Sequence, residues 1–417
     1  MAEQTNRNVP RIRFKGYVGE WEEKTLGELT PLRGGFAFKS IQFRKSGIPI
    51  VKISNVLPSG EVGGVFAFYD EQANDQNFSL PNNAALLAMS GATTGKVSIL
   101  EKQNSEKFYQ NQRVGYFEDL ATADYSFIST FVRSQFFTKQ LEAVLVAGAQ
   151  PNVSSKEINS FDLLTPIHPE QKQIGGYFRE VDRLIGLQQR KHDKLVTLKK
   201  AMLQKMFPQP GTPTPEIRFK GFSGNWKEKK LAELCDLFTD GDWIESKDQS
   251  ANGIRLLQTG NVGINKFVDK AGKARWISED TFGRLKCEEV FSGDILISRL
   301  PDPAGRACVV PKLSHRVITA VDCTIIRTAK TCGASFLVQH FSLASYFDTV
   351  NNYLGGGTRQ RISRSALGKF TIQLPSFAEQ QKIGHYFRTL DSLISKHAVQ
   401  LAKLKQLKSA CLEQMFV

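Results

Sequence analysis

The stretch PRIRFKGYVGEWEEKTL at residues 10–26 returns as PEIRFKGFSGNWKEKKL at residues 215–231, with eleven identical residues. A second repeat closes each half of the chain: EQKQIGGYFREVDRLIG starts at Glu170, and EQQKIGHYFRTLDSLIS starts at Glu379. A period of roughly 205 to 209 residues is too long for a solenoid repeat and fits a duplicated unit of one domain and one helix. The sequence therefore predicts a tandem pair whose two halves meet their target in related orientations.

The bulk composition is that of a globular and strongly basic protein. Its 417 residues carry a formal net charge of +14, and the pI is near 9.4. Lys and Arg that neutralise phosphates release counterions, so a protein this basic usually meets a polyanion; a merely basic surface is the alternative. No apolar run reaches the length of a membrane span and the N-terminus has no apolar signal region, so we expect a cytoplasmic location.

The cysteines argue against a disulfide framework or a zinc site. All six lie in the second half, and none has C-x-x-C spacing: Cys235, Cys287, Cys308, Cys323, Cys332 and Cys411. Because the first half has none, we expect reduced and mostly buried thiols.

Between the repeated ends, two divergent segments show short β-branched runs bounded by Gly, Asn and Asp, with helical patterns at Asp124–Leu145 and Ala334–Val350. The runs predict strands, so each segment is expected to be a mixed α+β globule. The expected strands are Ile48–Val56, Ala85–Ala88, Lys96–Leu100, Ile254–Gln258, Asp294–Ile297 and Ala307–Val310. The expected domains are residues 1–166 and 216–374, with long helices at 167–208 and 375–417 and a linker at 209–215.

The two long helices carry apolar residues on a heptad ladder, which is typical of a coiled-coil seam. In one chain, two such helices joined through a globule can pair antiparallel. Polar residues at Gln188, His192, Lys199, His397 and Lys408 interrupt the seam, either to set its register or to open it to a partner. The apolar ladder is formed by Ile174, Phe178, Val181, Ile185, Leu195, Met202 and Met206 in the first helix, and by Ile383, Phe387, Leu390, Ile394, Leu401, Leu404, Cys411 and Met415 in the second.

No motif in the chain predicts chemistry. The segment Gly91–Lys96 has three residues between its glycines where a Walker A loop has four, and Val97 follows the lysine, so it is interpreted as a turn between strands. The six histidines are isolated, and no dinucleotide fingerprint or metal-ligand cluster is present. We expect no catalytic residue, no cofactor and no metal.

Signals for binding are stronger, because Gly lets the backbone approach a target closely, and Gln, Asn, Arg, Lys and Ser are side chains that read base edges or bind phosphates. Ordinary turn chemistry is the alternative for the Asn and Ser residues. The candidate DNA-binding residues in the first half are Lys39, Ser40, Lys52, Ser54, Asn55, Thr93, Thr94, Lys96, Gln112, Arg113, Gln150, Asn152, Ser154 and Lys156. Those in the second half are Gln258, Thr259, Asn261, Arg299, Arg306, Arg359, Gln360, Arg361, Ser363 and Arg364.

These residues together resemble the specificity subunit of type I restriction–modification enzymes, over nearly the whole chain. The resemblance rests on the two RFKG openings, on GGFAFKS at Gly34–Ser40, on Met89–Gly95 and on Asn111–Gly115. Its most specific signal is the pair of helix openings at Pro166–Phe178 and Pro375–Phe387. The second half departs from the pattern, since Phe238–Asp242 replaces GGFAFKS and Arg299–Pro303 expands the Gly91 turn.

The resemblance implies a non-catalytic subunit in which two target-recognition domains each read one half of a split site in double-stranded DNA. The long helices would form an antiparallel coiled coil that sets the spacer and receives two methyltransferase (modification) subunits, and motor/nuclease (restriction) subunits would join the assembly. The partner-binding helices are marked by Ile174, Phe178, Val181, Ile185, Ile383, Phe387, Leu390 and Ile394.

Two other classes of function compete with this one. A coiled-coil scaffold whose globules bind proteins would show no affinity for nucleic acid. An enzyme acting on its own would show turnover from the purified chain, which the missing cofactor and metal motifs speak against.

Overall fold

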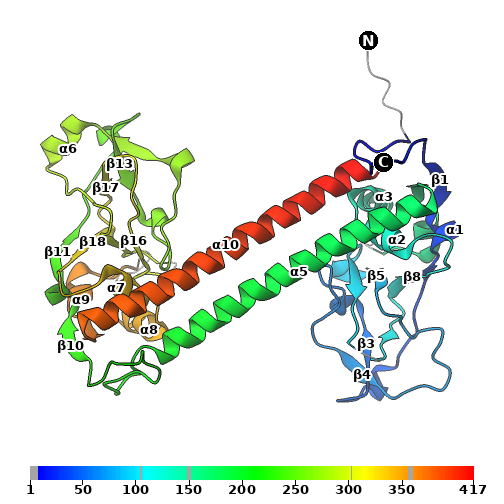
Figure 1. Cartoon of the computed structure of the whole chain (residues 1–417), viewed down its shortest axis with the longest axis horizontal. Coiled ribbons are helices and arrows are strands. Elements are labelled where there is room, and N and C mark those ends of the chain that lie inside the picture. The colour runs from blue at the N-terminus through cyan, green and yellow to red at the C-terminus, as the bar shows by residue number, and fades with distance from the viewer. Residues whose placement is uncertain (1–7, 104–105, 148–151, 302, 356–359) are drawn as a thin grey trace, which may run out of the picture. The chain divides into compact units, whose positions relative to one another are not determined.

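The computed structural model describes residues 8–103, 106–147, 152–301, 303–355 and 360–417. The chain forms two compact units, one of residues 1–189 with 399–417 and the other of residues 190–398 (Figure 1). Each unit combines one globule with part of both long helices, so the C-terminal end of the chain completes the first unit. The two units repeat one topology.

The first globule contains three small sheets and four short helices. Strand β1 (Glu22–Thr25) pairs antiparallel with β9 (Asp162–Thr165). A second sheet has the order β2-β8-β5-β6, formed by Leu32–Arg33, Val114–Phe117, Ala84–Ala88 and Val97–Leu100. A third has the order β4-β3-β7, formed by Ala67–Tyr69, Ile48–Val51 and Tyr109–Gln110. The helices are α1 (Leu26–Leu29), α2 (Tyr125–Phe131), α3 (Gln135–Ala147) and α4 (Ser155–Asn159).

The second globule has a similar arrangement, with a four-stranded sheet in place of the three-stranded one and with α6 (Glu279–Leu285) as an additional helix. Strand β10 (Lys227–Lys230) pairs antiparallel with β19 (Thr371–Leu374). One sheet has the order β11-β18-β15-β16, formed by Cys235–Asp240, Cys323–Thr328, Ile295–Ser298 and Ala307–Val309. Another has the order β12-β14-β13-β17, formed by Gln249–Ser250, Arg275–Ile277, Ile254–Leu257 and Val317–Thr319. The helices are α6 (Glu279–Leu285), α7 (Ala334–His340), α8 (Ala344–Asn352) and α9 (Arg364–Gly368).

The predicted α+β class is confirmed, and five of the six predicted strands form with ends that differ by at most one residue. The strand predicted at Ile48–Val56 ends at Val51, because residues 53–55 form a 3-10 turn. The two helical patterns predicted inside the globules each form two helices instead of one, α2 with α3 and α7 with α8. Serine accounts for part of the break: Ser134 Oγ accepts from the amide of Phe137, and Ser342 Oγ donates to the carbonyl of Val338. Serine favours such local bonds over helix continuation.

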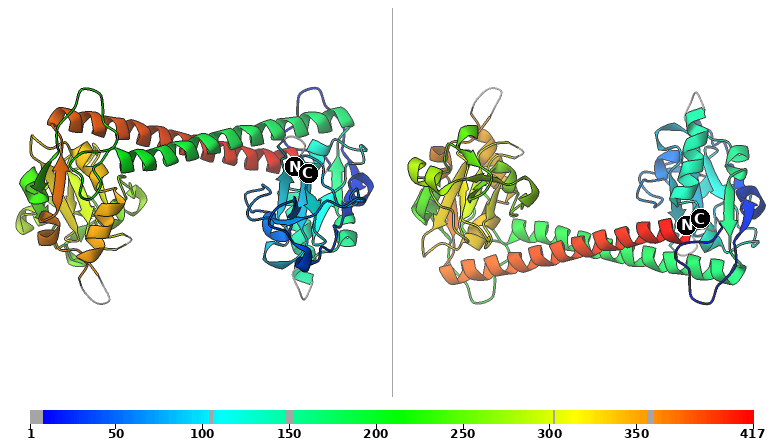
Figure 2. Two further views of the ribbon diagram at one scale, coloured as in Figure 1. Left: turned by 90° about the horizontal axis from the view of Figure 1, so that it is seen from below. Right: turned by 90° about the horizontal axis from the view of Figure 1, so that it is seen from above.

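The long helices are α5 (His168–Lys205) and α10 (Phe377–Met415). In the first unit, Asp182 of α5 pairs with Lys408 of α10 at 2.6 Å, and the rings of Phe178 and Phe416 lie in contact. In the second unit, Lys199 of α5 pairs with Asp391 of α10 at 2.5 Å. Within each unit, residue numbers rise along α5 as they fall along α10, so the predicted antiparallel pairing is confirmed; both views of Figure 2 show the end of α10 beside the start of α5 in the first unit.

The opening repeat and the helix repeat bind each other. Arg13 donates two hydrogen bonds of 2.7 Å to the fully buried carboxylate of Glu170 on α5, and Arg218 does the same to Glu379 on α10. The glycines of the helix repeat allow close packing, because a Cβ on Gly175 would lie 2.5 Å from the amide nitrogen of Phe127 in α2. The two repeated sequence segments of each half therefore contain the two partners of one ion pair.

Each core closes with a phenylalanine from the end of the other half's helix. Phe416 contacts Trp21, Phe127 and Phe178 in the first unit. Phe207 contacts Trp226, Phe336 and Phe387 in the second. Burying each of these side chains stabilises the unit by about 2–3 kcal/mol.

Five of the seam residues expected to mark the partner-binding helices lie inside these cores. Ile174 and Phe178 are buried in the core of the first globule, and Ile383, Phe387 and Leu390 in that of the second; Val181 is also buried. Ile185 and Ile394 are partly buried. The chain itself covers the five core residues among them, and the binding of a partner by these helices stays a prediction.

The cysteines and the helices bear on two further expectations. All six thiols are free, as predicted, and burial raises the pKa of Cys235 and of Cys332 to about 12.

Within the described part of the chain, no helix is both long and apolar enough to cross a membrane.

His340 makes the second unit sensitive to acid. Its ring contacts Phe207, Phe341 and Tyr346, and burial lowers its pKa to about 4. The unfolded chain takes up a proton near pH 6.5 and the folded one does not, so stability is unaffected above that pH. It falls between pH 6.5 and 4, by up to about 1.4 kcal/mol per pH unit.

The first unit has Phe131 at the equivalent position, in contact with Phe416. We therefore expect His340→Phe to gain stability relative to the wild type as the pH falls from 7.5 to 5, measured as the difference in unfolding midpoint at each pH. A difference that does not change with pH would contradict this account.

Candidate nucleic-acid interface

The first pair of expected binding loops follows β3 and β13 and has one geometry. The amide of Lys52 donates to Asn55 Oδ1 at 3.0 Å, and the amide of Gln258 donates to Asn261 Oδ1 at 2.9 Å. Each asparagine also donates from Nδ2 to a carbonyl further along the chain, at Gly63 and Val65 in the first case and at Val268 in the second. Both are buried, so they shape the loop.

The side chains that these loops present are therefore the neighbours of the asparagines. Ser54 is exposed, and Lys52, Gln258 and Thr259 are partly exposed. Lys52 lies over the ring of Phe43, 5.8 Å from its centroid, beside the turn in which Lys39 and Ser40 are exposed. Among these residues, the two buried asparagines have the supporting role that turn chemistry predicts.

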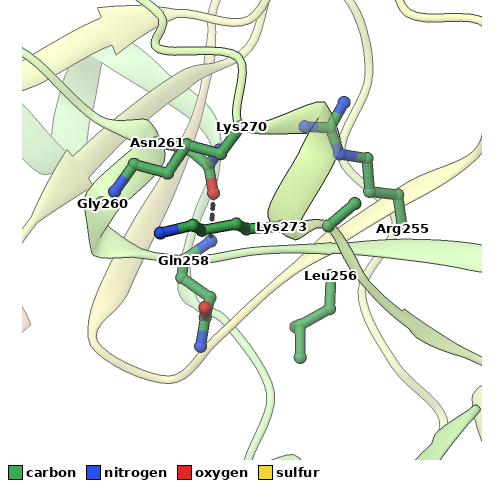
Figure 3. A pocket seen from close by; sticks show the side chains of 8 residues that line it. Arg255, Leu256, Gln258, Gly260, Asn261, Lys270 and Lys273 are labelled. Atoms are coloured by element: carbon green, nitrogen blue, oxygen red, sulfur yellow. Dashed lines mark hydrogen bonds between the residues drawn. The ribbon is translucent and has the colours of Figure 1, made fainter.

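A small polar cavity of about 30 Å³ lies beside Gln258 (Figure 3). Its lining includes the exposed Lys270 and Lys273, which the sequence analysis did not select. Lys270 lies close over Gly260, where a Cβ would be 2.5 Å from its Nζ, so the glycine makes room for the cation. The signal in the sequence was a pair of lysines around Ala-Gly in a loop, which composition alone does not distinguish from a solvated surface.

The Gly91 turn lies between β5 and β6, as predicted, and no helix follows it as a phosphate loop would require. Gly91 and Gly95 have φ of +79° and +86°, a conformation that favours glycine. Thr93 and Thr94 donate to carbonyls within this region, at Ile53 and Gly91, and Lys96 is exposed.

At the equivalent turn of the second globule, Gly305 has φ of +84°. Arg306 beside it donates to the carbonyls of five residues: Thr259, Val262, Leu300, Pro301 and Pro303. Its guanidinium is used to hold two loops together, so Arg306 supports the site in this structure.

A third pair of loops leads into α4 and α9. Ser154 accepts from the amide of Glu157, and Ser363 accepts from the amide of Ala366, so both cap a helix start. Asn152, Lys156, Gln360 and Arg361 are exposed. The expected residues Gln150 and Arg359 lie outside the described part of the chain.

The same backbone hydrogen bonds bring these loops together in both globules. In the first, the amide of Met89 donates to the carbonyl of Arg113, and the amide of Val153 donates to the carbonyl of Met89. In the second, Arg299 donates to Asp322 and Ile362 donates to Arg299 in the same way. We call these two backbone hydrogen bonds and the three residues that they join the frame of each globule. The frame brings together predicted binding residues: Gln112, Arg113, Asn152 and Ser154 in the first globule, and Arg299, Arg361, Ser363 and Arg364 in the second.

Two carboxylates of the second globule, Asp240 and Asp322, belong to the site although no pattern in the sequence indicated them. Arg299 is buried, with its Nη2 donating to the carbonyl of Val321 at 2.6 Å and its Nε 3.4 Å from Asp240. Asp322 lies 3.6 Å from Arg361, and Arg364 lies 3.8 Å from Asp240. Acidic residues are not a sequence signal for DNA binding, because DNA is itself an anion.

The fold and the repeated loops define a two-domain protein organised around two long helices. The chain belongs to the type I restriction modification DNA specificity domain family, whose model matches residues 19–197 and 223–406. Both the predicted family and the predicted duplication are thereby confirmed.

Relatives of the same kind support the assignment. The chain is 24% identical over 342 residues to the type I restriction enzyme MjaVIII specificity subunit of Methanocaldococcus jannaschii, covering 78% of this chain and 76% of the relative. It is also 24% identical over 270 residues to the putative MjaX specificity subunit of that organism, covering 62% and 59%. The crystal structure of the type I restriction–modification S subunit from M. genitalium shares the fold, with a TM-score of 0.60 at 14% identity over 98% of this chain and 99% of that one.

The buried asparagines lead to a stability prediction. Asn55→Ala or Asn261→Ala leaves one backbone amide and one or two carbonyls without a partner, so each should cost about 1–3 kcal/mol. We expect a lower midpoint in thermal or urea unfolding for both variants. The exposed Ser54→Ala serves as the control and should change stability by less than about 0.5 kcal/mol; equal midpoints for all three variants would contradict the supporting role.

Proposed function

We propose that this chain is the sequence-specific DNA-binding subunit of a type I restriction–modification complex, and that each globule reads one half of a bipartite site. The observation that carries the proposal is the backbone frame around Met89 and Arg299, built twice with different side chains. Two readers of different sequences need a constant scaffold and variable contacts. The net charge of +14 supplies attraction to the phosphates of the duplex.

Within each globule, the contacts divide into two kinds. Exposed lysines such as Lys39, Lys96 and Lys156 in the first globule and Lys270 and Lys273 in the second are proposed to contact phosphates, which position the domain without reading sequence. Gln112, Arg113 and Asn152 in the first globule and Gln258, Gln360 and Arg361 in the second are proposed to face base edges. Asn55, Asn261 and Arg306 are assigned to supporting these loops.

The long helices are proposed to set the spacer between the half-sites and to bind two modification subunits. The pairs Asp182–Lys408 and Lys199–Asp391 are 17 residues apart on each helix, so both units use the same antiparallel register. The apolar side chains available to a partner are those on the exposed faces of the helices: Leu184, Val196, Leu198, Leu393, Val399 and Leu407. Restriction subunits would join the same assembly.

The chain is proposed to act without catalysing a reaction itself. In the described residues, no group of three His, Cys, Asp or Glu side chains could hold a metal ion. A scaffold that only binds proteins would not account for the different charged side chains on the two frames, and the family assignment does not favour that function.

The proposal is tested by the complex of this chain with its modification subunits on duplexes of random sequence. One bipartite motif should be selected, with an affinity that falls steeply as salt rises. Lys270→Ala should weaken binding to all sequences and reduce the slope of log K against log salt by about one, while the motif stays the same. The control is Lys227→Ala on β10; equal binding of all sequences by the wild type would remove the proposal.

The spacer is tested by deleting one heptad from each helix, residues 187–193 and 397–403, which keeps both ion pairs in register. The deletion shortens each helix by about 10 Å, or about three base pairs of duplex. The selected motif should keep both half-sites and change the spacer between them, as read by methylome sequencing of a host that carries the variant complex. An unchanged spacer would refute the role of the helices as a ruler.

A further inference from the structure

Five charged side chains gather on the frame of the second globule: Asp240, Arg299, Asp322, Arg361 and Arg364. Arg299 lies at the centre, with 8% of its side chain exposed and with Asp240 at 3.4 Å and Asp322 at 3.9 Å. Each aspartate also contacts a second arginine: Asp322 lies 3.6 Å from Arg361, and Asp240 lies 3.8 Å from Arg364. Arg361 is exposed and Arg364 is partly exposed, so the cluster connects a buried charge to the surface.

The cluster is held in place by backbone and hydroxyl groups from several segments. Arg299 Nη2 donates to the carbonyl of Val321, and Thr324 Oγ1 donates to Asp240 Oδ1 at 2.8 Å. Arg361 pairs with Gly355 through two backbone hydrogen bonds, of 3.1 and 2.9 Å. Arg299 and Asp240 are therefore held in place by these bonds, whereas the exposed guanidinium of Arg361 is held, within the described residues, only by its 3.6 Å contact with Asp322.

The hydrogen bonding of the cluster is incomplete. Arg299 Nε and Asp322 Oδ1 are buried, and neither has a hydrogen-bond partner among the residues that the structure describes. A buried polar atom without a partner costs about 1–3 kcal/mol, and native proteins contain few of them. The longer charge contacts around them, at 3.4–3.9 Å, leave room for adjustment toward a ligand.

The equivalent positions of the first globule carry a different set of charges. The frame hydrogen bonds place Met89 where the second globule has Arg299, and Arg113 where it has Asp322. They also align Val153 with Ile362, which places Asn152 where the second globule has Arg361. One scaffold thus carries Met, Arg and Asn in one copy and Arg, Asp and Arg in the other.

We propose that these three frame positions determine the half-site that each globule selects. In the second globule, Arg361 donates to the O6 and N7 acceptors of a guanine in the major groove, and Asp322 is the positioning residue that orients its guanidinium. The buried Arg299 partly compensates the negative charge of Asp322 and Asp240. In the first globule, Arg113 takes the base-reading role at the position of the aspartate. This inference rests on the proposed function and adds the residues that set its specificity.

The chemistry fits a guanine for two reasons. A guanidinium has five N–H donors in a rigid fork, which matches the two acceptors of guanine, and a carboxylate beside one edge restricts its rotation. Asp322 lies 3.6 Å from Nη1 of Arg361, and 59% of the Arg361 side chain is exposed, so its Nε and Nη2 donors are left for a base. Without the carboxylate, the exposed arginine would bind phosphates as readily as base edges.

The test compares Asp322→Asn, Arg361→Ala and the double variant, each in the full complex with modification subunits, by selection from duplexes with both half-sites randomised. Asp322→Asn should reduce the preference for guanine at one position of one half-site by about tenfold or more, and leave the other half-site unchanged. It should have no further effect when Arg361 is already alanine, because it acts through that residue. Asp348→Asn, an exposed aspartate on α8, is the matched control.

Each other outcome decides against the inference. Unchanged selection by Asp322→Asn, loss of preference in both half-sites, or an effect that persists in the Arg361→Ala background would overturn it. If Asp322→Asn does not fold, Arg361→Lys decides, since it keeps the charge on an exposed side chain and removes the bidentate fork: a retained guanine preference would overturn the inference. A wild-type complex that selects no motif would instead remove the proposed function itself.

Discussion

The buried ion pair between the opening arginine and the first glutamate of each long helix is the interaction on which the rest of the structure depends. Glu170 and Glu379 are fully buried. Glu170 accepts two hydrogen bonds from Arg13, and Glu379 accepts two from Arg218. Hydrogen bonding to Glu170 raises the pKa of Arg13, and the second pair acts alike. Removing one partner of such a pair leaves a buried charge, which costs about 3–5 kcal/mol.

This pair matters because it fixes the start of a helix that then organises two cores. The next residue, Gln171, accepts from the amide of Asp124 and donates to the carbonyl of Pro166, so it fastens α2 to the helix start. Gln380 repeats both roles through Gly333 and Pro375. The glycine that follows lets α2 or α7 approach closely, and only then can Phe178 or Phe387 reach the core. The Glu, Gln, Gly and Phe positions that the two helix openings share thus each have a contact that accounts for the residue.

Each long helix contributes its first residues to one core and its last residues to the other, so neither globule is complete without the other half's helix. Phe416 and Phe207, each at or just beyond the end of a helix, fill equivalent places. The lysines that interrupt the apolar ladder pair across the helices with Asp182 and Asp391. A charged pair at a seam tolerates one register better than others, so these interruptions set the pairing at some cost in stability.

The sequence predicted the features that repetition or periodicity reveals, and missed those that depend on distant contacts. Identical residues 205–209 positions apart identified the duplication, and the heptad ladder identified the helices. The direction in which a polar side chain points was beyond such reasoning: Asn55 and Arg306 have the composition of base readers and are used to hold loops. The ladder also could not show that some of its apolar residues, such as Phe178 and Phe387, pack into the globules. Asp322 left no signal, because its significance comes from Arg299 and Arg361, which are neighbours only in the fold.

The two globules show how one architecture can change its target without changing its fold. The hydrogen bonds that define the frame run between backbone atoms, so they place no requirement on the side chains at positions 89, 113, 152, 299, 322 and 361. Burial does limit the choice, since the central position accepts Met89 without a partner but accepts Arg299 only with Asp240 and Asp322 nearby. In the proposed reading role, a change of specificity at the buried position therefore requires linked substitutions of Arg299, Asp240 and Asp322. Because Asp322 also contacts Arg361, the same linkage extends from the buried arginine to the exposed one.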